Sequence, residues 1–386
     1  MSLFWRRPRA ARSAPVRGRP DYVFIGLLAA LVAVGFVALT SASGPLGASK
    51  FHDGFHYLKR QFLFGLLPGT ALFLFLSRFE YRRLLRFWRL FLVASLVLLV
   101  VVFVPGLRAP WGTSRSWITL FGMSLQPIEI VKLTLAVAVA GWLESIGERG
   151  IRDWRQGLAP FLLGLGFVAG LVMAQPDTGG VMVLASLVVA QYLVAGAPWP
   201  HLAAIGAVGA AGLYAVVKAA PYRMARFMTF LHPELDPLGK GYHINQAYLA
   251  IGSGGVFGLG LGQGLQKKLY LPEVVGDSVV AVMAEELGFV LIILFLALFV
   301  AFVWRGFAVA RRTADVFGRL LATGLMAWMS IQAFLNVGSM VGLMPMTGLP
   351  FPFVSYGGTA LFASLAAMGL VVAISRTSRA PRNSRL

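Results

Sequence analysis

The sequence lacks cysteine altogether and is poor in acidic residues. Its 386 residues include 34 Lys and Arg but only 15 Asp and Glu, so the formal net charge is +19, and charged residues make up only 13% of the chain. The absence of cysteine excludes disulfide bonds and thiolate metal sites. The five histidines show no HExxH spacing, which excludes a zinc site of the metalloprotease type.

Apolar residues, by contrast, dominate the composition. Hydrophobic residues account for 58% of the chain, and the mean hydropathy is +0.76. A soluble protein cannot hide this much apolar surface, whereas a bilayer accepts it. The arginines fall in short clusters between apolar runs, as in loops that face a cytoplasm and anionic lipid headgroups. The composition therefore predicts an all-α, polytopic integral membrane protein with no nucleic-acid partner.

Ten apolar runs of bilayer length are expected to be transmembrane helices. They cover approximately residues 22–42, 61–77, 90–106, 125–143, 157–174, 179–197, 201–219, 279–304, 318–341 and 353–375. This membrane domain, residues 22–375, lies between two basic tails, 1–21 and 376–386, which we expect to be disordered. If the N-terminus is inside, the inner segments carry twenty-two Lys and Arg and the outer segments carry ten. Because Lys and Arg are enriched in cytoplasmic loops, this bias predicts that both termini are cytoplasmic.

One connection is much longer than the others. Residues 220–278 lie outside in this orientation and are rich in Gly, Pro and aromatic residues. Long loops in compact proteins are usually functional or disordered. This one is too apolar for disorder, so we expect an ordered extracytoplasmic loop that lies partly in the membrane interface.

Ionisable side chains within predicted spans require an explanation, because they are costly in a bilayer. In QPIEIVKL, residues 126–133, Glu129 and Lys132 are three apart and share one helix face. They form either an internal ion pair that staples the bundle or part of a polar site, and the two readings are compatible. In AQPDTGG, residues 174–180, Asp177 either caps the next helix or contacts a ligand.

A third acidic group stands at the start of the eighth run. Asp277 is either a helix N-cap or a carboxylate whose pKa apolar surroundings would raise toward that of a general base. Glu285 and Glu286 follow two turns deeper. At least one of them is expected to face the bundle interior and to pair with a cation or with the region around Lys132.

Two Gly- or Pro-rich segments are expected to be irregular. The run 252–264 has no preceding strand and no GKS/T ending, so a nucleotide site is not expected. Its glycines suit close helix packing or an irregular loop against the bilayer, and a backbone nest for a phosphate is a further alternative. Residues 344–358 contain three prolines and three glycines and cannot form a regular helix. Irregular backbone at membrane depth lines a cavity or is buried in protein, so this segment predicts a cleft near Ser355 and Tyr356.

Six strings occur in a characteristic order: QPIEIVKL, QPDTGG, GYHINQAYLAIGSGGVFGLGLG, QKKLYLPE, GDSVVAVMAEELGF and PMTGLPFPFVSYGG. From about residue 20 to 376 the chain resembles the shape, elongation, division and sporulation (SEDS) family, the RodA/FtsW-type peptidoglycan glycosyltransferases. The stretch GLGLGQGLQKKLYLPE looks more like the division (FtsW) branch than the elongation (RodA) branch. The resemblance also implies ten spans.

The resemblance implies polymerisation of lipid II at the outer face of the bacterial cytoplasmic membrane, with release of undecaprenyl pyrophosphate. The family's essential aspartate falls on Asp277. Other matching positions are Glu129, Lys132, Arg223, Arg226, Gln246, Lys267, Ser355 and Gly357. The chain departs from the family where His-Thr-Asp-Phe is usual, because it has Val275, Gly276, Asp277 and Ser278 there.

In the expected reaction a sugar hydroxyl attacks the anomeric carbon of the donor and expels a polyprenyl pyrophosphate. Asp277 is the expected base, or a ligand for a divalent cation such as Mg²⁺ or Mn²⁺ that assists departure. Arg223, Arg226 and Lys267 are expected to bind phosphate, and no nucleotide is needed.

The expected partners are a single-span class B penicillin-binding protein, which is a transpeptidase, and other divisome or elongasome membrane proteins. Two other functions compete with the glycosyltransferase: a flippase for a lipid-linked precursor and a scaffold that recruits the transpeptidase. A flippase should carry ionisable groups throughout the membrane depth, whereas here they gather at the expected outer ends.

Overall fold

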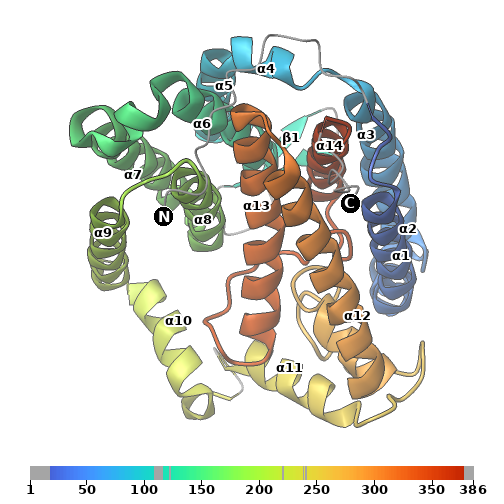
Figure 1. Ribbon diagram of the computed structural model, residues 1–386. Helices are drawn as coiled ribbons and strands as arrows, with labels where there is room; N and C mark the ends of the chain where they lie inside the picture. The colour runs from blue at the N-terminus through green and yellow to red at the C-terminus, as the bar shows by residue number, and fades with distance from the viewer. Residues whose placement is uncertain are drawn as a thin grey trace.

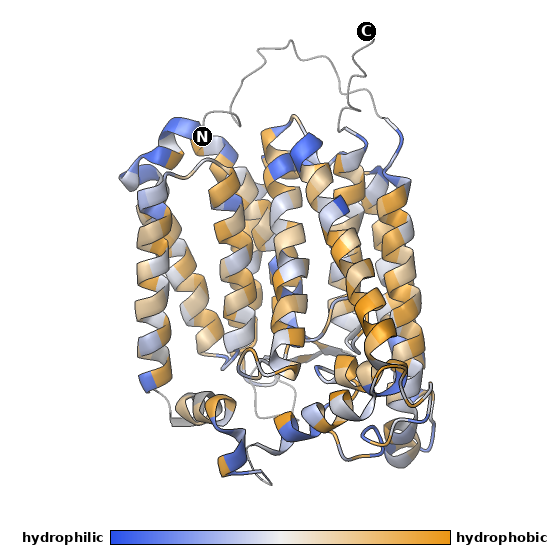
Figure 2. Ribbon diagram, turned by 60° about the horizontal axis from the view of Figure 1, so that its bottom comes forward, coloured by the Kyte–Doolittle hydropathy of each residue, from blue (hydrophilic) through white to orange (hydrophobic). Residues whose placement is uncertain are grey.

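The computed structural model describes residues 18–107, 116–120, 123–219, 221–237, 239 and 241–377. These residues form a bundle of long helices that run roughly side by side (Figure 1). Hydrophobic residues cover much of the length of the helices, and hydrophilic residues are more frequent toward the two ends of the bundle (Figure 2). The predicted basic tails lie mostly outside the described residues.

The elements follow one another in the following order. They are α1 (Tyr22–Phe51), α2 (His56–Gln61), the π-helical turn η1 (Phe62–Leu66), α3 (Leu67–Arg78), α4 (Arg82–Arg86), α5 (Trp88–Val101), the antiparallel strands β1 (Ile118–Leu120) and β2 (Met123–Leu125), α6 (Pro127–Arg152), the π-helical turn η2 (Trp154–Leu158), α7 (Ala159–Met173), α8 (Thr178–Val194), α9 (Trp199–Ala219), α10 (Pro221–Leu231), the 3₁₀ turn η3 (Pro233–Leu235), α11 (Tyr242–Ser253), α12 (Val279–Arg312), α13 (Val316–Met340) and α14 (Gly358–Ser375).

Seven helical segments within the described chain are long and apolar enough to cross a membrane. They are Tyr22–Phe51, His56–Arg78, Pro127–Arg152, Trp154–Met173, Val279–Arg312, Val316–Met340 and Gly358–Ser375. Two shorter apolar helices, α5 and α8, accompany them. Each of the ten predicted runs falls mainly on a helix, α9 included. The structure thus confirms a multi-pass helical protein, while the count of ten spans stays a prediction.

The centre of the bundle is occupied by α13 and α14. In each of these two helices 78% of the most apolar 18-residue stretch is buried inside the protein, whereas the value for His56–Arg78 at the periphery is 22%. Figure 1 shows α13 surrounded by the other long helices. A helix that is apolar all round is buried among others or faces lipid. We therefore assign the exposed apolar faces of the outer helices to the bilayer.

The second apolar run is continuous in spite of Pro68. Proline lacks an amide hydrogen and clashes with the carbonyl four residues earlier, which breaks a regular helix. Here the π-helical turn Phe62–Leu66 directly precedes α3, and Pro68 occupies the first turn of α3. The wider turn accommodates the proline, so His56–Arg78 forms one helical segment.

The beginning of α1 and the end of α14 lie side by side. The amide of Asp21 donates to Oγ of Ser375 at 3.1 Å, and the amide of Gly18 donates to the carbonyl of Arg376 at 2.8 Å. The last part of α12 reaches the same face, because Arg305 pairs with Asp21 at 2.7 Å. Both ends of the helical domain are thus on one side, as an even number of crossings requires.

The glycine-rich run after α11 packs closely against α12. A Cβ atom on Gly254 or Gly258 would collide with a backbone oxygen of α12, and α12 itself departs from helical geometry at Gly288, where φ is 73°. Backbone hydrogen bonds cross between the two segments: Leu259 donates to Glu285 at 3.0 Å, and Phe289 donates to the carbonyl of Gly255 at 2.9 Å. The expected close packing of these glycines is confirmed.

Candidate functional site

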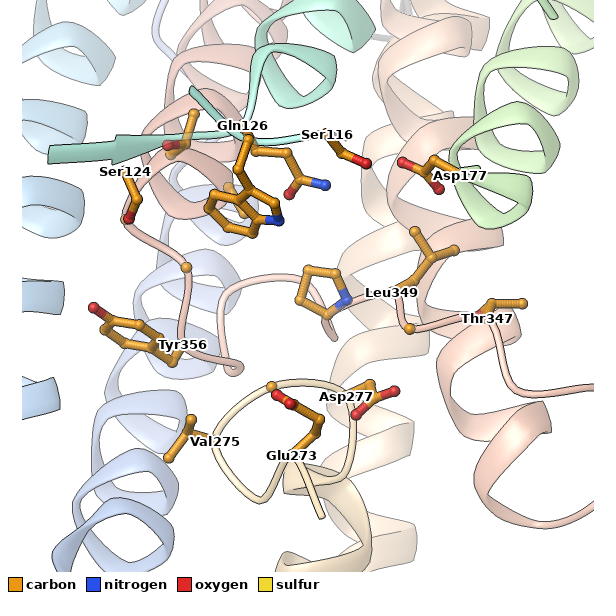
Figure 3. Close-up of a pocket in the computed structure, with 18 of the residues that line it drawn as sticks. Ser116, Ser124, Gln126, Asp177, Glu273, Val275, Asp277, Thr347, Leu349 and Tyr356 are labelled. Carbon is orange, nitrogen blue, oxygen red and sulfur yellow. The ribbon is translucent and has the colours of Figure 1, made fainter. Parts of the chain in front are cut away.

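A polar cavity of about 510 Å³ opens where several helices begin. It is lined by Arg60, Phe64, Ser116, Trp117, Ser124, Gln126, Pro176, Asp177, Glu273, Val275, Gly276, Asp277, Thr347, Gly348, Leu349, Pro350, Tyr356, Gly357, Gly358, Thr359 and Ala360. The lining residues from Thr347 to Gly358 lie in the segment 344–358 that was predicted to be irregular, and the predicted cleft is confirmed. Figure 3 shows side chains from the strands, from the turn before α8 and from the loop before α12 around this space.

The cavity lies at the end of the bundle opposite the two termini. Helix α14 begins at Gly358, which lines the cavity, and ends at Ser375, which contacts Asp21. Its 18 residues span about 27 Å at 1.5 Å per residue. That length approaches the thickness of the hydrocarbon core of a bilayer. The cavity and the arginine-rich face are therefore on opposite sides of the apolar region.

Asp277 reaches the cavity from the loop directly before α12. The residue is buried, with 8% of its surface exposed, yet it belongs to the cavity lining. Its backbone carbonyl accepts a hydrogen bond from Nδ2 of Asn336 at 2.8 Å, and the same amide group donates to the carbonyl of Leu349 at 2.8 Å. Ser278, not Asp277, occupies the N-cap position of α12, so the N-cap reading of Asp277 is wrong.

Asp177 caps a helix and also lines the cavity. Its Oδ1 accepts a hydrogen bond from the amide of Gly180 at 2.7 Å and so caps α8. The side chain also lines the cavity, where Figure 3 shows it on a different element from Asp277. Capping is confirmed, and contact with a ligand stays a prediction.

Glu129 and Lys132 form a buried ion pair at 2.6 Å. Lys132 also donates to Oε1 of Gln332 at 2.8 Å, and Nε2 of Gln332 donates to the carbonyl of Pro350 at 2.8 Å. Pro350 lines the cavity, whereas the charged pair does not. The internal ion pair is therefore confirmed, and Gln332 connects it to the cavity wall. A direct contact of either charge with substrate stays a prediction.

Ser355 belongs to the framework of the irregular segment. Its Oγ accepts from the amide of Phe351 at 2.8 Å, and its carbonyl accepts from Nε2 of Gln61 at 3.3 Å. Gln61 in turn accepts from the amide of Gly357 at 2.9 Å. The neighbour Tyr356 is the side chain that lines the cavity, and burial raises the pKa of this phenol, which is neutral at pH 7. A substrate contact by Ser355 stays a prediction.

Lys267 lies in a separate polar cluster. Its ammonium pairs with Glu286 and donates to Oγ of Ser41 at 2.8 Å, while Ser41 donates to Glu286 at 2.6 Å. Glu285 accepts from the amide of Leu265 at 2.8 Å. Glu286 thus faces the interior and pairs with a cation as predicted. Neither Glu285 nor Glu286 is paired with Lys132, because the ammonium group of Lys132 forms its ion pair with Glu129.

The remaining predicted residues lie on α10 and α11. Arg223 and Arg226 fall on α10, but their side chains are outside the described part of the chain. Gln246 is half-buried on α11 and is not part of the cavity lining. Among the expected phosphate-binding cations, Lys267 likewise does not line the cavity. Gln246 and Lys267 are thus outside the cavity lining, and the roles of all four residues stay predictions.

Several residues of the site were missed in the sequence. Among the described residues that line the cavity, Arg60 is the one with a cationic side chain. In the sequence it directly precedes an apolar run, where it resembled an ordinary charge at the end of a span. Gln332 and Asn336 are spaced one turn apart in α13 and are fully buried. Two amides in an apolar span are an identifiable signal, because unsatisfied polar groups are costly in a bilayer.

A histidine also lies close to Asp277. His243 on α11 places Nε2 at 2.7 Å from Oγ of Ser278 and at 4.0 Å from Oδ1 of Asp277. Burial lowers the pKa of His243 to about 4. The imidazole is therefore neutral at pH 7, and its approach to the carboxylate is a polar contact, not an ion pair.

The fit of a divalent cation can be tested against the carboxylates. Across the described part of the chain, no group of three or more His, Asp or Glu side chains is placed to hold a metal ion. Asp177, Glu273 and Asp277 share one cavity but do not form such a group. The protein alone thus provides no complete ligand set, unlike a resident metal site.

The fold and the site define the class of this protein. It is a multi-pass helical protein with a carboxylate-bearing cavity at one end of its bundle. The family model described as "Cell cycle protein", for FtsW, RodA and SpoVE, matches residues 21–380. The chain belongs to this family.

Curated relatives match nearly the whole chain. The "Stage V sporulation protein E" of Bacillus subtilis is 38% identical over 361 residues, covering 93% of this chain and 98% of the relative. The "Probable peptidoglycan glycosyltransferase FtsW" of Geobacter metallireducens is 36% identical over 358 residues, covering 92% of this chain and 95% of the relative.

Solved structures share the fold. A chain from the study titled "Structural coordination of polymerization and crosslinking by a peptidoglycan synthase complex" has a TM-score of 0.75 and 33% identity, covering 92% of this chain and 98% of the other. The rod shape determining protein RodA of Thermus thermophilus has a TM-score of 0.67 and 32% identity, covering 92% of this chain and 97% of its own.

Proposed function

We propose that this chain is a peptidoglycan glycosyltransferase that polymerises lipid II at the outer face of the bacterial cytoplasmic membrane. The observation that carries the proposal is the carboxylate of Asp277 in a polar cavity that also contains Arg60. The curated relatives named as probable peptidoglycan glycosyltransferases support the activity.

The proposed topology has ten spans, both termini in the cytoplasm and residues 220–278 outside. Its support is the arginine-rich face shared by the two ends of the helical domain. Arg82 pairs with Asp315 after α12 at 3.0 Å, and the hydroxyl of Tyr81 lies 3.0 Å from Oγ1 of Thr377 after α14. Short loops rich in Lys and Arg remain in the cytoplasm. The cavity at the opposite end then faces the outside.

The proposed chemistry is one glycosyl transfer with inversion. The 4-hydroxyl of the acceptor sugar forms a bond to the anomeric carbon of the donor as the bond from that carbon to the pyrophosphate oxygen breaks. Asp277 accepts the hydroxyl proton. Arg60 stabilises the negative charge that the polyprenyl pyrophosphate takes with it, since guanidinium groups suit phosphate oxygens. Because pyrophosphate is already a good leaving group, a second carboxylic acid is not required.

The buried polar network holds the cavity in shape for this reaction. Asn336 joins the backbone of Asp277 to Leu349, and Gln332 joins Lys132 to Pro350. Both amides come from the central helix α13. Catalytic groups are effective when they are held in position before substrate arrives. The role of Glu129 and Lys132 is therefore proposed to be indirect.

A divalent cation, Mg²⁺ or Mn²⁺, is proposed to arrive with the substrate. Magnesium is commonly held by one or two carboxylates together with substrate phosphates, and in that case a protein needs no complete cage. Asp277 is the carboxylate that would hold it. When bound, the cation would supply positive charge to the departing pyrophosphate.

The proposed partner is a single-span class B penicillin-binding protein within a division or elongation complex. The structural similarity to a chain of a peptidoglycan synthase complex supports such a partner. Assignment to the division branch is supported by the relatives named FtsW.

The proposal is tested by replacing Asp277 in the purified protein and supplying lipid II. Asp277→Asn keeps the volume and removes the base, and we expect polymerisation to fall about 10²- to 10⁴-fold. The melting temperature and binding of the partner should be unchanged. Normal polymerisation by this variant would refute the assignment. Efficient translocation of lipid II into vesicles that contain only this protein would favour the flippase instead.

A further inference from the structure

The segment before α12 departs from the pattern that the family resemblance implies, because Val275 and Gly276 stand where His-Thr is usual. A histidine nevertheless lies beside Asp277, and it comes from a different element. His243 is the second residue of α11, thirty-four positions earlier in the chain. It lies within the long connection 220–278 between predicted spans, on the helix of that loop that packs against α12 and α13.

The hydrogen bonds around Ser278 define how this histidine acts. Oγ of Ser278 lies 2.9 Å from the carbonyl of Pro272, which can only accept, so the single hydroxyl proton of Ser278 points there. Oγ of Ser278 must therefore accept from Nε2 of His243 at 2.7 Å. This assigns the proton of the neutral imidazole to Nε2.

The same N–H group is close to the carboxylate. Nε2 of His243 is 4.0 Å from Oδ1 of Asp277, and Oγ of Ser278 is 3.5 Å from the same oxygen. Ser278 is fully buried, whereas 24% of the His243 side chain is exposed. Neither side chain belongs to the cavity lining. His243 and Ser278 thus approach the carboxylate of Asp277 from outside the cavity lining.

We propose that His243 is a positioning residue for Asp277, acting through Ser278 as a histidine–serine support that replaces the histidine missing from position 275. The imidazole N–H holds Ser278 Oγ, the hydroxyl of Ser278 holds the carbonyl of Pro272, and these contacts fix the loop residues on both sides of Asp277. Oδ1 of Asp277 is kept toward this support, so the carboxylate presents a defined orientation to the cavity.

The contacts of His243 agree with a positioning role. The imidazole donates from Nε2 to Oγ of Ser278 at 2.7 Å, while Oδ1 of Asp277 lies 4.0 Å from the same nitrogen. The histidine therefore acts on the carboxylate through Ser278. The inference rests on the role proposed above for Asp277.

The test compares two replacements of His243 in the full-length protein with lipid II as substrate. His243→Leu removes the N–H donor, and we expect kcat to fall about tenfold with little change in KM, because one hydrogen bond is lost outside the cavity. His243→Gln retains a side-chain N–H donor and should keep kcat within about twofold of the native value. His232→Leu is the matched control, because His232 is exposed in the same loop and contacts only Glu234 among its described partners; it should be without effect.

Ser278→Ala provides a second test that removes a single oxygen. We expect the same loss of kcat as in His243→Leu, and no further loss when the two substitutions are combined, because both break one support. A normal kcat in His243→Leu or Ser278→Ala would overturn the inference. Equal loss in His243→Leu and His243→Gln would overturn it as well, because packing alone would then explain the effect. If Asp277→Asn polymerises lipid II normally, the role proposed for Asp277 fails, whichever result the histidine variants give.

Discussion

Asn336 holds the backbone of Asp277. Its Nδ2 donates to the carbonyl of Asp277 and to that of Leu349, each at 2.8 Å, and its side chain is fully buried. The two carbonyls belong to the loop before α12 and to the segment before α14, so one amide joins two walls of the cavity. A buried amide in such a position costs free energy unless it forms hydrogen bonds, and here the amide nitrogen of Asn336 donates to the carbonyls of two residues that line the cavity.

Replacing Asn336 should therefore impair the site more than its small size suggests. In Asn336→Leu the volume is kept, but two buried carbonyls lose their donor, at about 1–3 kcal/mol each. We expect kcat for lipid II polymerisation to fall by about tenfold or more, with a lower melting temperature. Ser339→Ala is the matched control, because this hydroxyl bonds only to the carbonyl of Asn336 within the helix, at 2.8 Å. Equal effects of the two substitutions would contradict the assigned role.

The Glu129–Lys132 pair permits a separate test of charge and of support. Lys132→Met should destabilise the protein by about 3–5 kcal/mol, because it leaves a buried carboxylate without its partner. The double variant Glu129→Gln with Lys132→Met removes both charges and should regain most of that stability. We expect its polymerisation to remain low, because Gln332 still lacks the lysine that orients it toward Pro350.

Thermal unfolding and polymerisation should be measured on the same preparations of these variants. The double variant decides between the two readings of the pair. Native activity in the double variant would mean that Glu129 and Lys132 only staple the bundle. Recovery of stability without recovery of activity would place their influence at the cavity wall.

The sequence was sufficient to predict the membrane class and the positions of the helices. Apolar runs of bilayer length directly indicate segments that are stable in a bilayer. Each predicted run falls mainly on a helix. The irregular backbone near Tyr356 was predictable as well, since proline and glycine exclude a regular helix there. Helix ends were less predictable. The run expected at 353–375 becomes helical only at Gly358, and of the residues before it Tyr356 and Gly357 line the cavity.

The candidate site could be predicted only in part. Asp277 and the Glu129–Lys132 pair were visible, the first from the resemblance and the second from charges spaced on one helix face. The partner of Lys267 was not predictable, because Glu286 approaches it from another element through tertiary packing. Arg60 was missed for the opposite reason, since a charge beside an apolar run carries no sign of the cavity it faces.

Arg60 should matter more than the lysine beside it. Arg60→Gln removes the cation of the described cavity lining, and we expect kcat/KM for lipid II to fall about ten- to a hundredfold, as for the loss of a charged hydrogen bond. Arg60→Lys should restore part of the rate through its charge. Lys59→Gln is the control, because Lys59 is exposed and pairs with Asp53 at 2.8 Å outside the cavity.

Removal of divalent cations should lower the rate without loosening the fold. We expect a chelator to slow lipid II polymerisation at neutral pH, and added Mg²⁺ or Mn²⁺ to restore it, because Asp277 with pyrophosphate oxygens can hold such an ion. The melting temperature should not change in the absence of substrate, since the described residues provide no complete set of metal ligands and a metal stabilises a fold only by binding it. Polymerisation that is insensitive to chelation would leave Asp277 as the base alone. A melting temperature that falls with the chelator would instead reveal a structural ion and contradict the present account of the cavity.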